Sequence, residues 1–380
     1  MNPIRVLVVD DSVVIRKVLC SALASDPAIE VIGTAPDGRI ALAKIAQLKP
    51  DLVTLDVEMP VLSGLETIPE IRKLYPKLPV IMFSTLTARG ASTTLEALAL
   101  GASDYINKPS NTGSLELTIE KIKQDLLPKI KALCGRVQLP AYLPPQPATI
   151  TSSPAIPMPA AAISALPRPR HTGPFDILAI GTSTGGPNAL ADVLSAIPGD
   201  FPVPIVIVQH MPPLFTRTLA ERLEKKAAIS VREGQPGAKL RAAEAWIAPG
   251  DYHMTVERHG VDVNLAMNQG PPENSCRPAV DVLFRSVATV FGPSALAVVL
   301  TGMGSDGVLG ARAVHQRGGR VFVQDEASSV VWGMPGQVAA AGLADAIYPL
   351  HDMAREIYRQ VRMSRPASRE SLGLVPSKSG

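Results

Sequence analysis

Five residues in the first half of the chain have side chains suited to binding and accepting a phosphoryl group. Asp10 and Asp11 follow the first apolar run, Asp56 ends the third, Ser84 ends the fourth and Lys108 follows the fifth. Carboxylates that lie together repel one another unless a divalent cation joins them, and hard oxygen ligands suit Mg²⁺. The lysine favours a ligand with several negative oxygens, for which Asp56 is a candidate nucleophile. One strand-end aspartate often only solvates a loop, but five such residues at successive strand ends predict a site.

The motifs around these residues are VLVVDDS, LVTLDVEMPVLSGLE, PVIMFST and DYINKP. With them the first half of the chain resembles the receiver domain of two-component response regulators. The resemblance implies that Asp56 accepts a phosphoryl group from a histidine kinase. It also implies that Asp10, Asp11, Asp56 and the backbone carbonyl of Glu58 hold Mg²⁺.

Further positions of the first half match the receiver pattern. The resemblance implies that Lys108 and Ser84 contact the phosphoryl oxygens. Tyr105 matches the switch aromatic of receiver domains, although a core aromatic explains the residue equally well. The bond before Pro109 is usually cis in such domains, which a sequence alone does not define.

A serine in a glycine-rich turn is the candidate nucleophile of the second half. FDILAIGTSTGGP predicts a strand that enters a turn before a helix, and residues 181–185 fit the pattern GxSxG around Ser183. A phosphate or dinucleotide site is the alternative, because such turns direct backbone donors at anions. The turn lacks both the full GxGxxG spacing and the lysine of a phosphate-binding loop.

A serine nucleophile needs a base, and the base needs an orienting carboxylate. His210 closes the next apolar run, VIVQH, and Asp306 lies in the turn after ALAVVLTGMGSDG. All three residues end strands at one predicted edge of the sheet. Their order differs from the Ser, Asp or Glu, His order of the hydrolases that usually carry GxSxG.

Five motifs of the second half, GTSTGGP, VIVQHMP, APGDYHM, RPAVDVLF and LTGMGSDG, resemble the catalytic domain of chemotaxis protein-glutamate methylesterases of the CheB type. The resemblance implies that Ser183 is the nucleophile, His210 the general base and acid, and Asp306 its orienting residue. It places Thr184 and Met303 at the site, where Met303 would offer a backbone amide to the oxyanion. A turn threonine and a loop methionine are the alternatives.

Two other residues of the second half invite a chemical interpretation. His253 lies in the APGDYHM motif, where we expect a structural role in the pocket wall. Cys276 suggests a cysteine nucleophile, which we do not favour because its motif contains no histidine.

The elements that must position these residues form an α/β fold. Apolar runs alternate with helical patterns in both halves, which favours parallel sheets covered by helices on both faces. We expect a five-stranded parallel, flavodoxin-like receiver domain over 1–135. A catalytic domain over 175–362 would be doubly wound and mostly parallel, with at least one antiparallel pair around 245–267. Ten of the 36 prolines lie between Pro140 and Pro174, which predicts an extended linker over 136–174, and a polar tail follows over 363–380.

The composition excludes several classes of protein. The 380 residues are 46% hydrophobic and 19% charged, and no apolar run is long enough for a membrane span. The net charge of +3 comes from the expected linker and tail, so no folded basic surface indicates nucleic-acid binding. Three scattered cysteines give no disulfide framework, and the start lacks a secretory pattern. We therefore expect a cytoplasmic protein without membrane insertion.

The sequence thus predicts a phosphorylation-activated serine esterase. By the resemblance, its substrates are glutamate γ-methyl esters and glutamines of methyl-accepting chemoreceptors, and a chemotaxis histidine kinase is its phosphodonor. Mg²⁺ would serve the receiver domain, and the esterase site would need no cofactor. The alternative is a phosphorylation-gated docking module without catalysis. A DNA-binding response regulator is disfavoured because no helix-turn-helix is recognisable.

Overall fold

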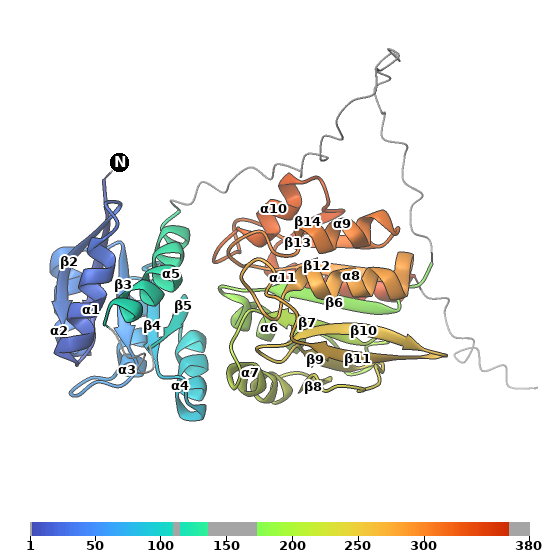
Figure 1. Ribbon diagram of the computed structural model, residues 1–380, viewed down its shortest axis with the longest axis horizontal. Helices are drawn as coiled ribbons and strands as arrows, with labels where there is room; N and C mark the ends of the chain where they lie inside the picture. The colour runs from blue at the N-terminus through green and yellow to red at the C-terminus, as the bar shows by residue number, and fades with distance from the viewer. Residues whose placement is uncertain (1, 109–114, 136–172, 365–380) are drawn as a thin grey trace, which may run out of the picture.

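The computed structural model describes residues 2–108, 115–135 and 173–364, which form two α/β domains side by side (Figure 1). Most of the expected linker and of the expected tail, and the bond before Pro109, lie outside the described residues. Both halves of the chain have the predicted α/β class.

The receiver domain is built on a five-stranded sheet in the order β2-β1-β3-β4-β5, and all of its strand pairs are parallel. This is the flavodoxin-like order, which confirms the expected fold. The strands are β1 (Ile4–Val9), β2 (Ile29–Ala35), β3 (Leu52–Asp56), β4 (Val80–Ser84) and β5 (Asp104–Asn107). Alternate residues of β1 enter different hydrophobic clusters on the two faces, which explains its continuous apolar sequence.

Helices cover both faces of this sheet, and short polar side chains begin most of them. The Ser63 side chain accepts from the Glu66 amide while the Glu66 carboxylate accepts from the Ser63 amide, a reciprocal pair that fixes the start of α3. The helices are α1 (Val13–Ala24), α2 (Gly38–Leu48), α3 (Gly64–Leu74), α4 (Ala88–Ala99) and α5 (Leu115–Leu133). Helices α1 and α5 pack on one face, and α2, α3 and α4 pack on the other.

The catalytic domain has a seven-stranded sheet in the order β14-β13-β12-β6-β7-β9-β8. All of its pairs are parallel, and the expected antiparallel pair instead forms a separate two-stranded sheet, β10-β11. The main strands are β6 (Ile177–Thr182), β7 (Ile205–Gln209), β8 (Ser230–Glu233), β9 (Glu244–Ile247), β12 (Ala295–Val299), β13 (Arg320–Gln324) and β14 (Ala346–Tyr348). The separate hairpin consists of β10 (His253–His259) and β11 (Asp262–Asn268).

Helices cover both faces of the larger sheet, so this domain is doubly wound as expected. Helices α6, α7 and α11 pack on one face, and α8, α9 and α10 pack on the other. Their bounds are α6 (Gly186–Ser195), α7 (Phe215–Glu224), α8 (Val280–Phe291), α9 (Val308–Gln316), α10 (Met334–Ala340) and α11 (Leu350–Met363), with a short 3₁₀ turn at Gly292–Ser294. The β10-β11 hairpin contributes Met254, Val256 and Leu265 to the cluster beneath α8.

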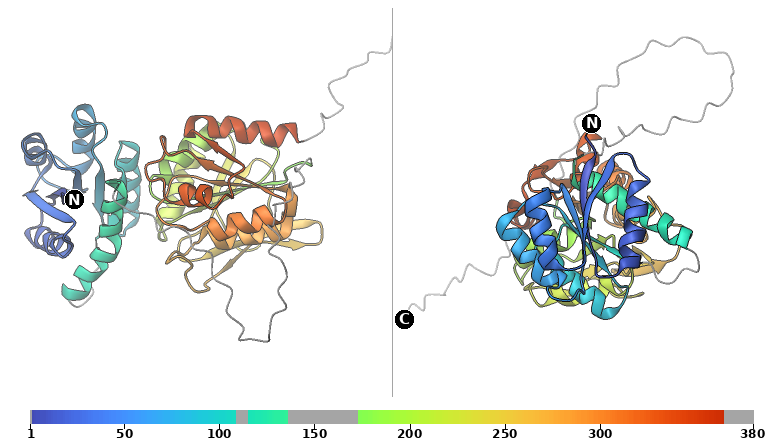
Figure 2. Two further views of the ribbon diagram at one scale, coloured as in Figure 1. Left: turned by 90° about the horizontal axis from the view of Figure 1, so that it is seen from above. Right: turned by 90° about the vertical axis from the view of Figure 1, so that its left-hand side faces the viewer.

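The two domains share one hydrophobic cluster at the face formed by α4 and β5 of the receiver domain. Tyr105 stacks on Phe215 of α7 with ring centroids 4.8 Å apart and planes 4° from parallel. The Asn188 side chain of α6 donates to the carbonyl of Leu98 at 2.7 Å. Figures 1 and 2 show α4 and α5 on the side of the receiver domain that faces the catalytic domain.

The beginning and the end of the catalytic domain meet. The amide of Phe175 donates to the Ser364 hydroxyl at 3.1 Å, directly after α11. Among the described residues, no helix is both long and apolar enough to cross a membrane.

Candidate active site

The three acidic residues of the receiver domain converge at the carboxyl ends of β1 and β3. One oxygen from each of Asp10, Asp11 and Asp56 lies within 4.8 Å of the others. Asp10 and Asp56 are buried, whereas Asp11 is exposed. This all-oxygen set, open on one side, fits a Mg²⁺ ion.

Lys108 extends from the end of β5 into the same pocket. Its Nζ lies 2.7 Å from Asp56 Oδ2 and 3.2 Å from Asp10 Oδ2. Burial raises the pKa of Asp56 to about 6, with the neighbouring Asp10 charge adding to the rise and Lys108 opposing it. The pocket therefore joins a buried carboxylate to a cation that can hold an anionic group.

Three further candidate residues of the receiver domain, Ser84, Glu58 and Tyr105, have their side chains bound to other partners. Ser84 ends β4, but its buried hydroxyl accepts from Thr94 at 2.6 Å and donates to the Gly90 carbonyl at 3.2 Å. The Glu58 side chain is exposed and lies 3.7 Å from Arg89. Tyr105 packs against the catalytic domain, so it is buried between domains and not within the receiver core.

Two glycines that follow Ser183 fix the turn that carries it. At Gly186 a Cβ would lie 2.0 Å from Gln209 Oε1, and Gly185 has a left-handed φ of +79°. The Ser183 amide donates to the Thr301 carbonyl at 3.1 Å, while its carbonyl accepts from Gln209 Nε2 at 2.9 Å. Only glycines allow this close packing, which holds Ser183 at the end of β6.

His210 and Asp306 meet as the sequence predicts. His210 Nε2 lies 2.8 Å from Asp306 Oδ2, and Asp306 is 2% exposed. Burial opposes a charged imidazole, but the hydrogen bonds to Asp306 and Cys276 outweigh it and raise the pKa of His210 to about 10. Burial likewise acts to raise the pKa of Asp306, yet its contacts with His210 lower it overall. The pair therefore favours an imidazolium beside a carboxylate.

Cys276 lies against the other nitrogen of this imidazole. Its Sγ is 3.5 Å from His210 Nδ1, a contact that the separation of the two residues in the sequence did not suggest. The motif of Cys276 contains no histidine, but the fold brings His210 from elsewhere in the sequence to the thiol. In the described part of the chain, no hydrogen bond joins Ser183 Oγ to His210. Catalytic hydrogen bonds are often completed only when substrate is bound.

The loop that contains Met303 lies directly beside the serine. A Cβ on Gly302 would lie 2.9 Å from the Cβ of Ser183 and 3.0 Å from its amide nitrogen. The Gly302 carbonyl accepts from the amides of Gly333 and Met334, which fixes the loop. The loop that leads into Met303 is thus held against Ser183.

His253, for which we expect a structural role in the pocket wall, is held by backbone groups. It is 2% exposed, its Nε2 lies 3.0 Å from the Pro271 carbonyl, and its Nδ1 accepts from the amide of Ala279 at 3.3 Å. Both nitrogens are therefore occupied by backbone groups of the segment that leads into α8.

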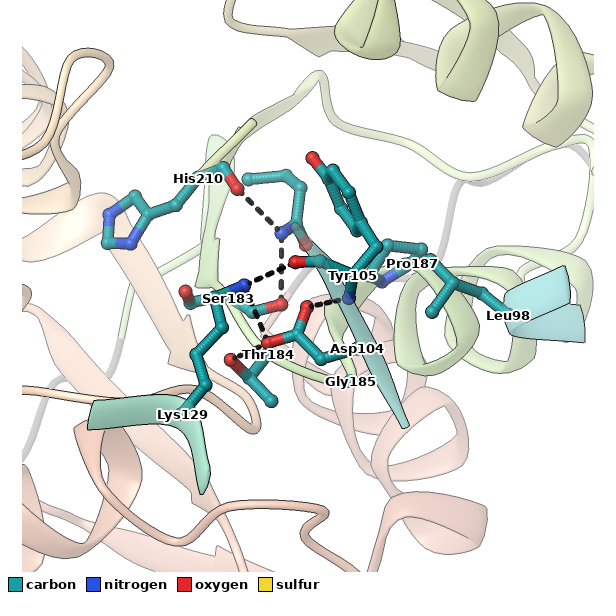
Figure 3. A pocket seen from close by; sticks show the side chains of 10 residues that line it. Leu98, Asp104, Tyr105, Lys129, Ser183, Thr184, Gly185, Pro187 and His210 are labelled. Atoms are coloured by element: carbon teal, nitrogen blue, oxygen red, sulfur yellow. Dashed lines mark hydrogen bonds and ion pairs between the residues drawn. The ribbon is translucent and has the colours of Figure 1, made fainter. Parts of the chain in front are cut away.

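A pocket between the domains contains the candidate nucleophile and base. Figure 3 shows Thr184 facing Asp104 of the receiver domain, with Ser183 and Lys129 beside them, whereas the imidazole of His210 points away from Asp104 and Lys129. Thr184 Oγ1 donates to Asp104 Oδ2 at 2.7 Å, and Lys129 Nζ lies 2.8 Å from the same oxygen. The cavity measures only about 40 Å³, room for a few water molecules and too little for a substrate side chain.

Known proteins match both domains of the chain. The receiver domain model for response regulators matches residues 6–120, and the model for the CheB methylesterase matches residues 178–357. The protein-glutamate methylesterase/protein-glutamine glutaminase of Trichodesmium erythraeum is 52% identical over 95% of this chain and 100% of its own length. The chain belongs to the CheB methylesterase family. Its CheB relative of the same name in a Nocardioides species is 50% identical over 97% of this chain and 98% of its own length.

A solved CheB structure covers the second half. The catalytic domain of the Thermotoga maritima CheB methylesterase is 38% identical, covers 49% of this chain and 98% of its own length, and has a TM-score of 0.48. Within this CheB chain, the residues that surround Asp306 are the part of the site that sequence reasoning missed. The motif RPAVDVLF supplies two of its hydrogen-bond donors, from the amides of Val280 and Asp281.

Proposed function

We propose that this chain hydrolyses glutamate γ-methyl esters on methyl-accepting chemoreceptors and deamidates receptor glutamines, under control of its receiver domain. The full-length similarity to protein-glutamate methylesterases supports the activity. The geometric observation that carries it is the bond between His210 Nε2 and Asp306 Oδ2, together with the pocket that both His210 and Ser183 line.

The reaction begins with Ser183. Its Oγ attacks the ester carbonyl carbon while His210 takes the hydroxyl proton, and Asp306 stabilises the imidazolium that forms. Collapse of the tetrahedral intermediate breaks the bond to the methoxy oxygen, which leaves as methanol with the proton from His210. Water then attacks the acyl-enzyme and releases glutamate and the free serine.

The oxyanion of each tetrahedral intermediate needs fixed donors. We assign the Met303 amide to this role because its loop contacts Ser183 and is held by Gly333 and Met334. One such donor contributes roughly 3 kcal/mol to lowering the barrier. With a glutamine side chain the same steps release ammonia in place of methanol.

The receiver domain supplies the control. Asp56 accepts a phosphoryl group from a histidine kinase, and Mg²⁺ held by Asp10, Asp11, Asp56 and the Glu58 carbonyl would offset the charge of that group. Lys108 lies close enough to contact its oxygens, and Ser84 would need to exchange its present partners to do so. Since the receiver domain covers Ser183 in this structure, phosphorylation of Asp56 would activate the enzyme by loosening the contact between domains.

The partners of this proposal are a chemotaxis kinase and the cytoplasmic parts of chemoreceptors, so the proposal includes a cytoplasmic location. Residues 136–174 serve as the linker between the domains. A non-catalytic docking module is not favoured, since Ser183, His210 and Asp306 are all present and His210 is bound to Asp306.

The deciding assay measures methanol released from a methyl-esterified receptor fragment by the full chain. We expect turnover that increases when Mg²⁺ and a small phosphodonor are added. Ser183→Ala would abolish it, whereas hydrolysis by this variant at the rate of the unaltered chain would refute the serine mechanism.

A further inference from the structure

A second buried carboxylate lies behind Asp306 at the start of α8. Asp281 is 1% exposed, and its Oδ1 accepts from the amides of Gly307 at 2.9 Å and Gly310 at 2.7 Å. A Cβ on Gly310 would lie 2.5 Å from the Cβ of Phe284, so α9 packs closely against α8 here. Asp281 thereby fixes the beginning of α9, the helix that immediately follows Asp306.

One side-chain amide connects the two carboxylates. Asn274 Nδ2 lies 3.1 Å from Asp281 Oδ2 and 3.1 Å from Asp306 Oδ1. Asn274 and Ser275 have left-handed φ values of 50° and 61° in a turn that Glu273 and Cys276 close with reciprocal backbone hydrogen bonds. Asparagine tolerates this conformation better than most residues, so the turn holds its amide at a fixed place.

The remaining contacts of Asp306 show what this arrangement achieves. Oδ2 accepts from the Val280 amide and faces His210 Nε2, whereas Oδ1 accepts from the amides of Asp281 and Gly307 at 2.9 and 3.0 Å. Within the part of the chain that the structure describes, Asn274 is the only side chain other than His210 that forms a hydrogen bond with Asp306. It restrains the carboxylate from the side opposite the imidazole.

Keeping two carboxylates this close is costly, which argues that the arrangement has a purpose. Burial raises the pKa of Asp281 to about 6, and the charge of Asp306 adds to the rise. The donors on both carboxylates and the nearby Arg285, which is paired with Glu273, offset part of this cost. An apolar residue at position 281 would avoid the repulsion but would leave the Gly307 and Gly310 amides without this acceptor.

We propose that Asp281 and Asn274 are positioning residues that align Asp306 with His210 Nε2. The pair acts through Asp306 and does not touch substrate. The expected effect on kcat rests on the proposed esterase function. The expected effect on the bond between His210 and Asp306 does not depend on that function.

The sharpest variant is Asn274→Gly, because glycine accepts the left-handed backbone and removes only the amide side chain. Ser275→Gly is its matched control, since it makes the same backbone change at the neighbouring left-handed residue. Asp281→Asn is the second variant, which keeps an acceptor for the glycine amides but places a donor opposite Asn274. Each is made in the full chain, and thermal melting establishes that it is folded.

Two readouts are measured with phosphodonor and Mg²⁺ present. We expect Asn274→Gly and Asp281→Asn to lower kcat at least tenfold with KM within twofold, and Ser275→Gly to keep both values. Proton NMR of the imidazole N–H between His210 and Asp306 reports the alignment without turnover. We expect its downfield resonance to move upfield or broaden in Asn274→Gly and Asp281→Asn alone.

The inference is overturned if Asn274→Gly matches Ser275→Gly in both kcat and the imidazole resonance. If the unaltered chain hydrolyses no ester, the proposed function fails, yet the resonance still decides whether Asn274 and Asp281 align the pair. A loss of kcat with an unchanged resonance also overturns the inference, because the effect would then not pass through Asp306.

Discussion

Asp104 of the receiver domain accepts a hydrogen bond from Thr184, the residue that follows the candidate nucleophile Ser183. The 2.7 Å contact joins residues 80 positions apart in the sequence and lies within the pocket between the domains. Lys129 shares the same Asp104 oxygen, so the receiver domain closes the site with a charged pair and with the stacked rings of Tyr105 and Phe215.

Replacing Asp104 with alanine is expected to raise the esterase rate of the unphosphorylated chain several-fold. The change removes the Thr184 contact and leaves Lys129 without its carboxylate, so the closed arrangement loses stability. Initial rates of methanol release without phosphodonor provide the measurement. Glu70→Ala, which breaks an exposed ion pair with Lys73 on α3, is the control. An unchanged rate in Asp104→Ala would mean that this contact does not restrain the enzyme.

The nucleophile can be distinguished from the neighbouring thiol by two substitutions. Ser183→Ala is expected to reduce turnover by at least a thousandfold, because no acyl-enzyme can form. Cys276→Ala is expected to retain turnover within about tenfold, since the thiol contacts the imidazole and is not itself the assigned nucleophile. Trapping of the acylated residue followed by peptide mass spectrometry identifies it directly. Acylation of Cys276 would show that this thiol, and not the Ser183 hydroxyl, is the nucleophile.

The pH dependence of the unphosphorylated chain follows from His210. A pKa raised to about 10 means that the neutral imidazole needed as base becomes more abundant up to that pH. We expect the basal rate to rise about tenfold per pH unit between about 7 and 9. The hydrogen bond to Cys276 contributes to the raised pKa of His210, so Cys276→Ala should shift the profile to lower pH. Superimposable profiles would contradict this role of the thiol.

The same shift has a consequence for folding stability. The pKa of His210 in the folded chain lies above its ordinary value of 6.5. The imidazolium therefore makes its full contribution to the free energy of unfolding below pH 6.5. This contribution is lost as the pH rises through about 10. The difference in melting temperature between the unaltered chain and His210→Gln should therefore be larger at pH 6 than at pH 10.

Asp56→Asn is expected to abolish activation by phosphodonor while leaving the basal rate. It should also stabilise the receiver domain, because the pKa of Asp56 is raised to about 6 by burial first, with the Asp10 charge adding. The carboxyl therefore contributes stability below pH 3.8 that is lost as the pH rises through about 6. Asparagine removes this loss, which is worth about 3 kcal/mol at pH 8. Denaturant unfolding at pH 8 and pH 4 tests the sign, and a smaller gain at pH 8 than at pH 4 would contradict it.

The sequence allowed the central strands and the strand-end residues to be predicted for a physical reason. Strands buried on both faces, such as β6 and β12, are continuous apolar runs, and the carboxyl ends of parallel strands share an edge. Strands β8 and β14 lack this signal because their sequences, SVRE and AIY, are short and only partly buried. The antiparallel hairpin was expected within the main sheet, but it forms a sheet of its own. The sequence could not show this, because sequence patterns do not define which strands pair.

Contacts made by turns and between domains had no sequence signal. Cys276 reaches His210 because the left-handed turn at Asn274 and Ser275 redirects the chain, and only the folded backbone shows that turn. The Asp104 contact depends on how two separately folded units meet. Ser84 and Tyr105 illustrate the same limit, because their positions were predicted but their partners, Thr94 and Phe215, were not.

The hydrogen bond between Phe175 and Ser364 brings the two ends of the catalytic domain to one corner. A domain whose ends meet can be inserted into, or removed from, a longer polypeptide without rearranging its sheet. It is also suited to circular permutation, with new ends opened at the hairpin tip beside Val261, which is 94% exposed. The catalytic domain is therefore suited to fusion with a regulatory domain other than this receiver.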